Sequence, residues 1–193
     1  MLEVIYYVAS SIDGYIATTN GDVDWLSRFH VSGEDHGVGK LQASIDALLL
    51  GSHTYEFALK LGHWPSPDKP SWVFSQRDLP VLHPSITLTS HSPSEVLDDL
   101  TKRGFRKAWL MGGGKLAASF HASGLISEYI ISVFPLLLGS GIPFLAPHSS
   151  AQDTLSLVTA KAFKSGIVQL TYRGAEKTSA ARSGQRRRRK EKI

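Results

Sequence analysis

A short apolar run leads into three glycines at Lys107-Ala-Trp-Leu-Met-Gly-Gly-Gly-Lys115, and a run with helical spacing follows as Leu116-Ala-Ala-Ser-Phe-His-Ala122. The run Ala108 to Met111 has the length of a buried strand. A strand, a glycine turn and a helix start bring backbone N–H groups and the positive end of a helix dipole to one point. Glycine also lets the backbone pass close to a ligand, because no Cβ stands in the way. The stretch fits a phosphate-binding turn and equally a tight connection that binds nothing.

The composition describes one soluble domain. The chain has 193 residues, of which 42% are hydrophobic, and this suffices for one buried core. It has no cysteine, which excludes disulfides, thiolate metal sites and a cysteine nucleophile. The start carries no basic leader, and no segment approaches the ~20 continuous apolar residues of a membrane helix. We therefore expect a cytoplasmic protein without a membrane partner.

The net charge of +4 comes from the end of the chain. Residues 174–193 hold eight Lys/Arg and two acids, which leaves 13 basic and 15 acidic residues on the rest. We expect residues 1–174 to form a single domain and residues 175–193 to be a disordered basic tail. A nucleic-acid-binding fold would carry a basic face on its folded part. Nucleic acid is therefore expected at most through the tail, which also fits a solubilising or expression-derived extension.

Strand and helix patterns alternate along most of the chain. Apolar β-rich runs indicate strands, helical spacing indicates helices, and two alternating runs near the end indicate a hairpin. Ser92 is the predicted cap of the helix 92–103, with Pro93 at its first helical position. The order predicts an α/β fold with a mostly parallel sheet, helices on both faces and an antiparallel C-terminal hairpin at the edge. The predicted strands are 2–10, 46–51, 71–75, 86–89, 108–111 and 126–134, the helices 33–44, 52–61, 92–103 and 116–124, and the hairpin strands 154–163 and 166–173.

Three candidate ligand-binding segments each follow a predicted strand. They are Gly51-Ser-His-Thr54, Ser75-Gln-Arg77 and Gly112 to Lys115. Ligands of parallel α/β sheets bind beyond the C-terminal ends of the strands. Because all three segments fall at those ends, they share one rim of the sheet, and together they favour a phosphate-bearing cofactor.

Five motifs then follow one another in a familiar order. They are Val8-Ala-Ser-Ser-Ile-Asp-Gly-Tyr-Ile-Ala17, Leu49-Leu-Gly-Ser-His-Thr-Tyr-Glu56, Trp72-Val-Phe-Ser75, Leu110 to Lys115 and Phe134 to Phe144. They resemble the S-x-D-G-x-I-A, L-L-G-R-x-T-Y-E, strand-before-S-R, x-x-G-G-G and P-x-L-L-G-x-G-x-P-L-F motifs of the dihydrofolate-reductase-like superfamily. The match includes the reductase domain of riboflavin biosynthesis and its stand-alone relatives, and it covers residues 4 to about 173.

The resemblance implies NADPH as the hydride donor and a homodimer, for which Ile126 to Phe134 with the turn that follows it is a candidate surface. It implies that backbone groups of Ala9 and Ile16 hold the nicotinamide carboxamide. It places the pyrophosphate at a helix start and the adenosine ribose with its 2′-phosphate near the end of the third strand. By position, the remaining contacts are Gly51, His53 and Thr54 (pyrophosphate), Ser75, Gln76 and Arg77 (adenosine ribose), and Gly112, Gly113, Gly114, Lys115 and Leu116 (diphosphate and nicotinamide ribose).

The chain departs from the family pattern in two places. Ser52 stands where the family usually has an arginine that meets the 2′-phosphate, so a preference for NADPH over NADH then depends on Arg77 and His53. The riboflavin reductase domains also carry a D-D-P-x-L-T-x-R segment that handles the phosphoribosyl substrate. Here that region reads Leu61-Gly-His-Trp-Pro-Ser-Pro-Asp-Lys-Pro70. The substrate therefore need not be the phosphorylated aminopyrimidine.

Acidic residues before the second strand are the candidates for substrate chemistry. In dihydrofolate reductases such an acid binds the pterin, and counting back from Gly51 gives Asp35, with Glu34 beside it. We assign Asp35 to orienting or protonating a heterocycle and Glu34 to substrate binding, although an acid at a helix start can simply face the dipole. Trp25 would line the substrate pocket or belong to the core. The histidines show no metal-ligand spacing, so we expect no metal site.

The sequence thus predicts an NADPH-dependent reductase of a small nitrogen heterocycle, such as a pterin or an aminouracil derivative. A second hypothesis is a binding module of the same fold with little turnover, which Ser52 and the missing phosphate segment favour. A third is nucleic-acid binding through the arginine run of the tail.

Overall fold

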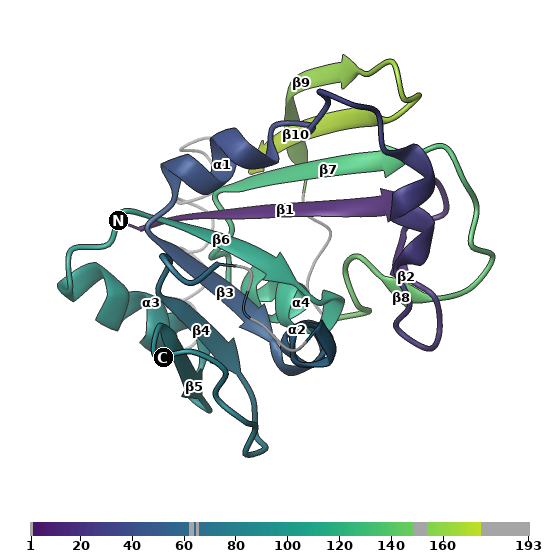
Figure 1. Cartoon of the computed structure of the whole chain (residues 1–193). Coiled ribbons are helices and arrows are strands. Elements are labelled where there is room, and N and C mark those ends of the chain that lie inside the picture. The colour runs from purple at the N-terminus through teal and green to yellow at the C-terminus, as the bar shows by residue number, and fades with distance from the viewer. Residues whose placement is uncertain (1, 62–63, 65, 149–153, 175–193) are drawn as a thin grey trace, which may run out of the picture.

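Eight strands form one sheet in a computed structural model that describes residues 2–61, 64, 66–148 and 154–174 (Figure 1). Six neighbouring strands are parallel and the last two are antiparallel to their neighbours. In sheet order they are β5 (Ile86–Thr89), β4 (Ser71–Phe74), β3 (Ala47–Gly51), β6 (Lys107–Gly112), β1 (Glu3–Ser11), β7 (Glu128–Phe134), β10 (Val168–Gly174) and β9 (Leu155–Ala162).

Helices cover both faces of the parallel part. On one face α1 (Val38–Ser44) and α2 (Ser52–Leu61) pack on a core cluster, and on the other face α3 (Pro93–Lys102) and α4 (Gly114–Ala122) pack on a second cluster. Strands that are covered on both sides read as continuous apolar runs, which is why β1 and β3 are buried along most of their length. The predicted fold class, including the C-terminal hairpin, is confirmed.

The start of α3 follows its sequence signal. The Ser92 hydroxyl accepts a hydrogen bond from the Glu95 backbone N–H, while the Glu95 carboxylate accepts one from the Ser92 backbone N–H at 2.8 Å. This is a capping box with Pro93 at the first helical position. The predicted cap is confirmed. Its groups all belong to residues 92–95, so the signal for it is local in the sequence.

The start of α1 differs from the prediction. The prediction of a helix over 33–44 was wrong for its first five residues, since the α-helix begins at Val38. Gly37 has a φ of 85°, in the left-handed region, and the Asp35 carboxylate accepts hydrogen bonds from the N–H groups of Gly37 and Gly39. The chain also forms a short 3-10 helix, η1 (Asp24–Phe29), between β2 and α1.

The strand proposed as a dimer surface lies inside the sheet. β7 is hydrogen-bonded to β1 on one side and to β10 on the other, so neither of its edges is open to a partner. A two-stranded ribbon, β2 (Tyr15–Ala17) with β8 (Ile142–Pro143), sits near the C-terminal ends of the parallel strands (Figure 1). The predicted tail falls outside the described residues.

Candidate functional site

Two strand-to-helix turns touch at the C-terminal rim of the sheet. β3 and β6 are neighbours, and each runs directly into a helix, α2 and α4. A Cβ added to Gly51 would lie 3.4 Å from the Gly113 backbone nitrogen and 3.5 Å from the Gly112 carbonyl oxygen, and one added to Gly113 would lie 3.6 Å from Thr54 Oγ1. We call Gly51, Thr54, Gly112 and Gly113 the glycine cradle. Its turns are held this close because no side chain stands between them.

The three consecutive glycines differ in backbone conformation and in surroundings. Gly112 has a φ of 106°, which favours glycine, and it is joined to Gly113 by a cis peptide bond. Gly113 forms part of the glycine cradle. Gly114 packs inward, because a Cβ there would collide with the carbonyl oxygen of Pro143, and its own carbonyl accepts a hydrogen bond from the Ala146 N–H at 3.1 Å. The side of Gly114 where a Cβ would stand is thus filled by protein.

The first turn of α4 extends the glycine cradle. Leu116 is partly buried, and its Cβ would be 3.7 Å from a Cβ on Gly51, while Lys115 is exposed beside it. Within the part of the chain that the structure describes, no side chain caps the start of this helix. Its first backbone N–H groups and its positive dipole end are therefore available to an anion.

The segment after β4 is tied to α2. The Ser75 hydroxyl accepts a hydrogen bond from the Arg77 N–H at 3.0 Å and donates one to the Arg77 carbonyl at 2.8 Å. The Gln76 amide donates to the Ser90 carbonyl at 3.3 Å. Arg77 Nη1 lies 2.9 Å from Glu56 Oε1 on α2, an ion pair that the sequence interpretation missed. His53 is exposed in the first turn of α2.

An aromatic cluster lies at the end of β1. Trp25 packs edge-to-face on Phe134 with ring centroids 5.3 Å apart, and Ala9 packs against the same cluster. Trp25 is 4% exposed, and among the described residues its indole N–H has no hydrogen-bond partner. Such an orphaned buried donor is uncommon, and a ligand acceptor would satisfy it. Ile16, the other residue predicted at the nicotinamide, packs against a different core cluster, the one on which α3 and α4 pack.

The two candidate acids stand in the loop before α1. The Asp35 carboxylate is exposed and accepts the Gly37 and Gly39 N–H groups at 2.8 and 3.0 Å, and these bonds hold its pKa below the ordinary range. Glu34 accepts the N–H groups of Lys164 and Ser165 in the turn between β9 and β10. Glu34 therefore binds the protein's own backbone.

His36 links this loop to the aromatic cluster, and the sequence interpretation missed it. Its ring packs 4.8 Å from Phe163 and 6.3 Å from Phe134, and its Nε2 lies 3.2 Å from Ser165 Oγ. Its carbonyl accepts hydrogen bonds from the Tyr7 hydroxyl and the Gln169 amide. Trp25 and the 34–36 segment thus share Phe134 as a neighbour, which places the predicted substrate residues at one end of β1 and β7.

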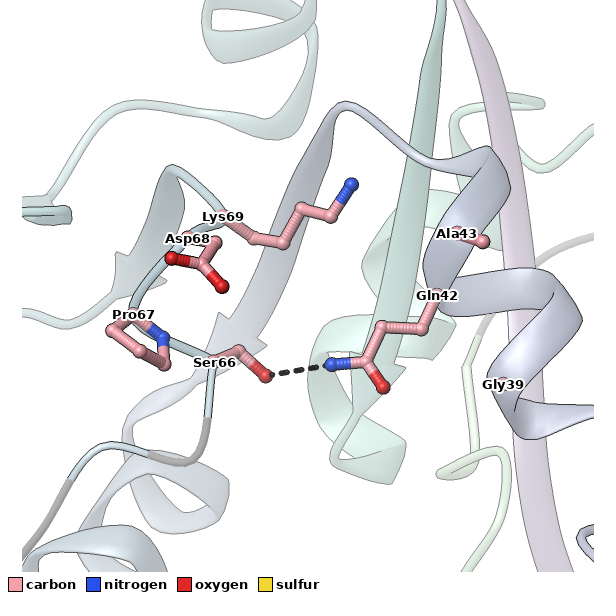
Figure 2. A pocket seen from close by; sticks show the side chains of 7 residues that line it. All are labelled: Gly39, Gln42, Ala43, Ser66, Pro67, Asp68 and Lys69. Atoms are coloured by element: carbon pink, nitrogen blue, oxygen red, sulfur yellow. Dashed lines mark hydrogen bonds between the residues drawn. The ribbon is translucent and has the colours of Figure 1, made fainter.

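A separate cavity of about 290 Å³ opens between α1 and the segment 66–69 (Figure 2). The Gln42 amide donates a hydrogen bond to Ser66 Oγ across it at 3.4 Å, and the Lys69 ammonium is held by the Ile45 carbonyl at 2.7 Å. None of the predicted site residues lines it; its lining residues are Gly39, Gln42, Ala43, Ser66, Pro67, Asp68 and Lys69.

The described residues contain neither a metal-binding cluster nor a membrane-spanning helix. Within them, no group of three or more His, Cys, Asp or Glu side chains is arranged to hold a metal ion. No helix among those same residues has the length and apolar character needed to cross a membrane.

The sheet order and the paired glycine turns at its rim define a dihydrofolate-reductase-like α/β protein. The chain matches the model of the RibD C-terminal domain over residues 3–169, and it belongs to that family. It is 33% identical over 172 residues to "Uncharacterized protein YwjB" of Bacillus subtilis (strain 168), covering 88% of this chain and 97% of that protein.

Two further similarities extend the match. Over 154 residues the chain is 30% identical to the riboflavin biosynthesis protein RibD of Mycobacterium tuberculosis (strain ATCC 25618 / H37Rv), covering 72% of this chain and 44% of that protein. A solved structure from Shewanella sp. PV-4, whose name assigns it provisionally to riboflavin biosynthesis, has a TM-score of 0.82 and 28% identity. That match covers 91% of this chain and all of the other.

Proposed function

We propose that this protein is an NADPH-utilising reductase of a small nitrogen heterocycle, such as a pterin or an aminouracil derivative. The observation that carries the proposal is the contact between the two glycine turns, where Gly51 and Gly113 approach so closely that a Cβ on Gly51 would lie 3.4 Å from the Gly113 nitrogen. Membership of the RibD C-terminal domain family supports the same reading.

The residues of the rim fit a dinucleotide. A diphosphate needs backbone N–H donors and positive helix ends with room for its oxygens. The starts of α2 and α4 meet at the glycine cradle, and an added Cβ would occupy the space there. When bound, the nicotinamide would supply a hydride to the substrate. The glycine cradle would hold the diphosphate, while Ser75, Gln76 and Arg77 would flank the adenosine end.

On the substrate side the chain's own residues would orient the heterocycle and exclude water. Trp25 and Phe134 form an apolar wall beside Ala9, and the unpartnered Trp25 N–H could donate a hydrogen bond to a ring carbonyl or ring nitrogen. Because the pKa of Asp35 is lowered, its carboxylate is ionised at neutral pH. It would therefore orient a substrate N–H by accepting a hydrogen bond, and its role as a proton donor stays a prediction.

One observation favours the second hypothesis, a binding module with little turnover. Both oxygens of Asp35 already accept backbone N–H groups, so the candidate acid is committed to the start of α1. The module would bind the dinucleotide as the reductase does, and it would differ only in lacking oxidation of NADPH.

The test is a titration of the full chain with NADPH, followed by nicotinamide fluorescence, and by absorbance at 340 nm once a pterin or aminouracil is added. We expect Gly113→Ala to weaken NADPH binding about tenfold or more, since its Cβ enters the glycine cradle at ordinary contact distance from Thr54 and leaves the fold intact. Gly174→Ala is the control, because nothing lies within 4 Å of its added Cβ.

Binding without oxidation of NADPH by any acceptor would select the binding module. Absence of NADPH binding by the unchanged chain would overturn the proposal.

A further inference from the structure

The one arginine predicted at the adenosine end already has a partner. Arg77 Nη1 lies 2.9 Å from Glu56 Oε1, with the side chains 55% and 29% exposed. Arg77 lies just after the C-terminal end of β4, and Glu56 lies on α2 one turn after Ser52. The pair therefore joins the segment after β4 to α2, the helix that begins at the glycine cradle.

The backbone of Arg77 is fixed where it can form this pair. Its N–H and carbonyl both bond to the Ser75 hydroxyl, and the neighbouring Gln76 bonds to Ser90. The hydrogen bond from Arg77 is the largest cause of the lowered pKa of Glu56, and the positive charges of Arg77, His53 and Lys60 lower it further. Glu56 is thus a charged carboxylate at neutral pH, and it faces the only cation of the 75–77 segment.

NADPH and NADH differ only by the 2′-phosphate. A site selects NADPH by offering that phosphate an unpaired cation, and it selects NADH by placing a carboxylate near the ribose hydroxyls. Here the phosphate would have to take Arg77 away from Glu56 and leave a carboxylate beside its own negative charge. Ser52, at the first position of α2, adds no positive charge.

We propose that Glu56 is a specificity-determining residue that neutralises Arg77, so that this site binds NADH about as tightly as NADPH. The inference rests on the proposed function, because it assumes a dinucleotide at the glycine cradle. The pair is partly exposed to water, so its effect is moderate. We expect dissociation constants for the two dinucleotides that differ less than about threefold.

The experiment measures dissociation constants of NADPH and NADH by fluorescence for the unchanged chain and three variants. Glu56→Gln keeps the size of the side chain and removes its charge, so we expect NADPH to bind about three- to tenfold more tightly and NADH to bind as before. Arg77→Gln in addition to Glu56→Gln should remove that gain. Glu128→Gln is the matched control, since Glu128 forms an ion pair with Arg173 at 2.7 Å where β7 begins, the end opposite the rim.

Thermal unfolding of each variant confirms that it is folded. A preference for NADPH greater than tenfold in the unchanged chain, left as it is by Glu56→Gln, would overturn the inference while the proposed function stands. Binding of neither dinucleotide would overturn the proposed function and this inference with it.

Discussion

Asp35 shows how a single side chain can serve the fold where a sequence pattern assigns it to chemistry. Its two carboxylate oxygens accept the N–H groups of Gly37 and Gly39, which otherwise would lack partners at the start of α1. The same bonds favour the ionised form and lower the pKa of the carboxyl group. The residue is therefore linked to folding as well as to any substrate.

That link predicts a pH dependence. A carboxyl group whose pKa is lower in the folded state stabilises the fold above its unfolded pKa of about 3.9, and this stabilisation is lost as the pH falls through the lower folded value. We expect Asp35→Asn to be less stable than the unchanged chain at pH 7, and the difference to shrink below pH 4. Urea unfolding at several pH values measures this difference in the free energy of unfolding.

Asp98→Asn, at an exposed position of α3, is the control for charge alone. A difference between Asp35→Asn and the unchanged chain that stays constant over the whole pH range would contradict the argument.

At the scale of elements, the loop before α1 is fastened to the β9–β10 turn. Glu34 accepts the N–H groups of Lys164 and Ser165 at 3.2 and 3.4 Å, and His36 packs on Phe163 from the same loop. Two segments about 130 residues apart thus fix one another. The hairpin is consequently part of the candidate substrate side, although it lies outside every motif of the sequence.

We expect Glu34→Ala to lower the free energy of unfolding by about 1 kcal/mol, because it removes the acceptor of the exposed Lys164 N–H and of the partly buried Ser165 N–H. Amide hydrogen exchange at Lys164 and Ser165 should become faster, while the β1 amides exchange as before. Asp98→Ala serves as the control. Unchanged exchange at the two turn amides would show that water replaces the carboxylate at no cost.

The elements also show what a sequence can predict. The Ser92 cap and the strand–glycine–helix turns at Gly51 and Gly112 are local signals, and the structure has each where it was expected. The start of α1 depends on a left-handed Gly37, and Glu34 finds its partners on a distant turn, so neither could be read from neighbours along the chain. The roles assigned to the site residues stay predictions.

The Arg77–Glu56 pair illustrates the same limit within the candidate site. Both residues belong to motifs that were recognised, but their contact exists only because β4 and β3 are adjacent in the sheet and α2 follows β3. Spacing along the chain cannot give the distance between two side chains on different elements. The pairing therefore had to come from the structure.

At the scale of the whole molecule, the sheet edge formed by β9 exposes apolar side chains. Within the described residues β9 is paired on one side only, with β10, and seven of its eight residues are exposed, among them Leu157 at 56% and Val158 at 47%. Bare edge strands tend to pair with another strand. A two-fold axis brings the same edge of two copies together in antiparallel register. We propose β9 as the surface of the homodimer that the family resemblance implies.

The prediction is that Leu157→Lys converts a dimer into a monomer, because it places a charge in the apolar part of that edge. Light scattering coupled to size exclusion measures the mass. Val81→Lys is the matched control, since Val81 is an exposed apolar residue in the segment between β4 and β5. A monomeric unchanged chain, or a dimeric Leu157→Lys variant, would refute the assignment.

Gly113 and Gly114 are adjacent in the sequence, yet the space around each of them is very different. Gly114 is required for folding, because any larger residue meets the Pro143 carbonyl and displaces the segment that contains β8. Gly113 has room for a methyl group, and under the proposed function its constraint is the dinucleotide bound at the rim. A library screened for soluble expression should therefore retain alanine at 113 and reject it at 114. A library screened for ligand binding should reject alanine at both positions. Two neighbouring positions would then distinguish the requirements of folding from those of binding.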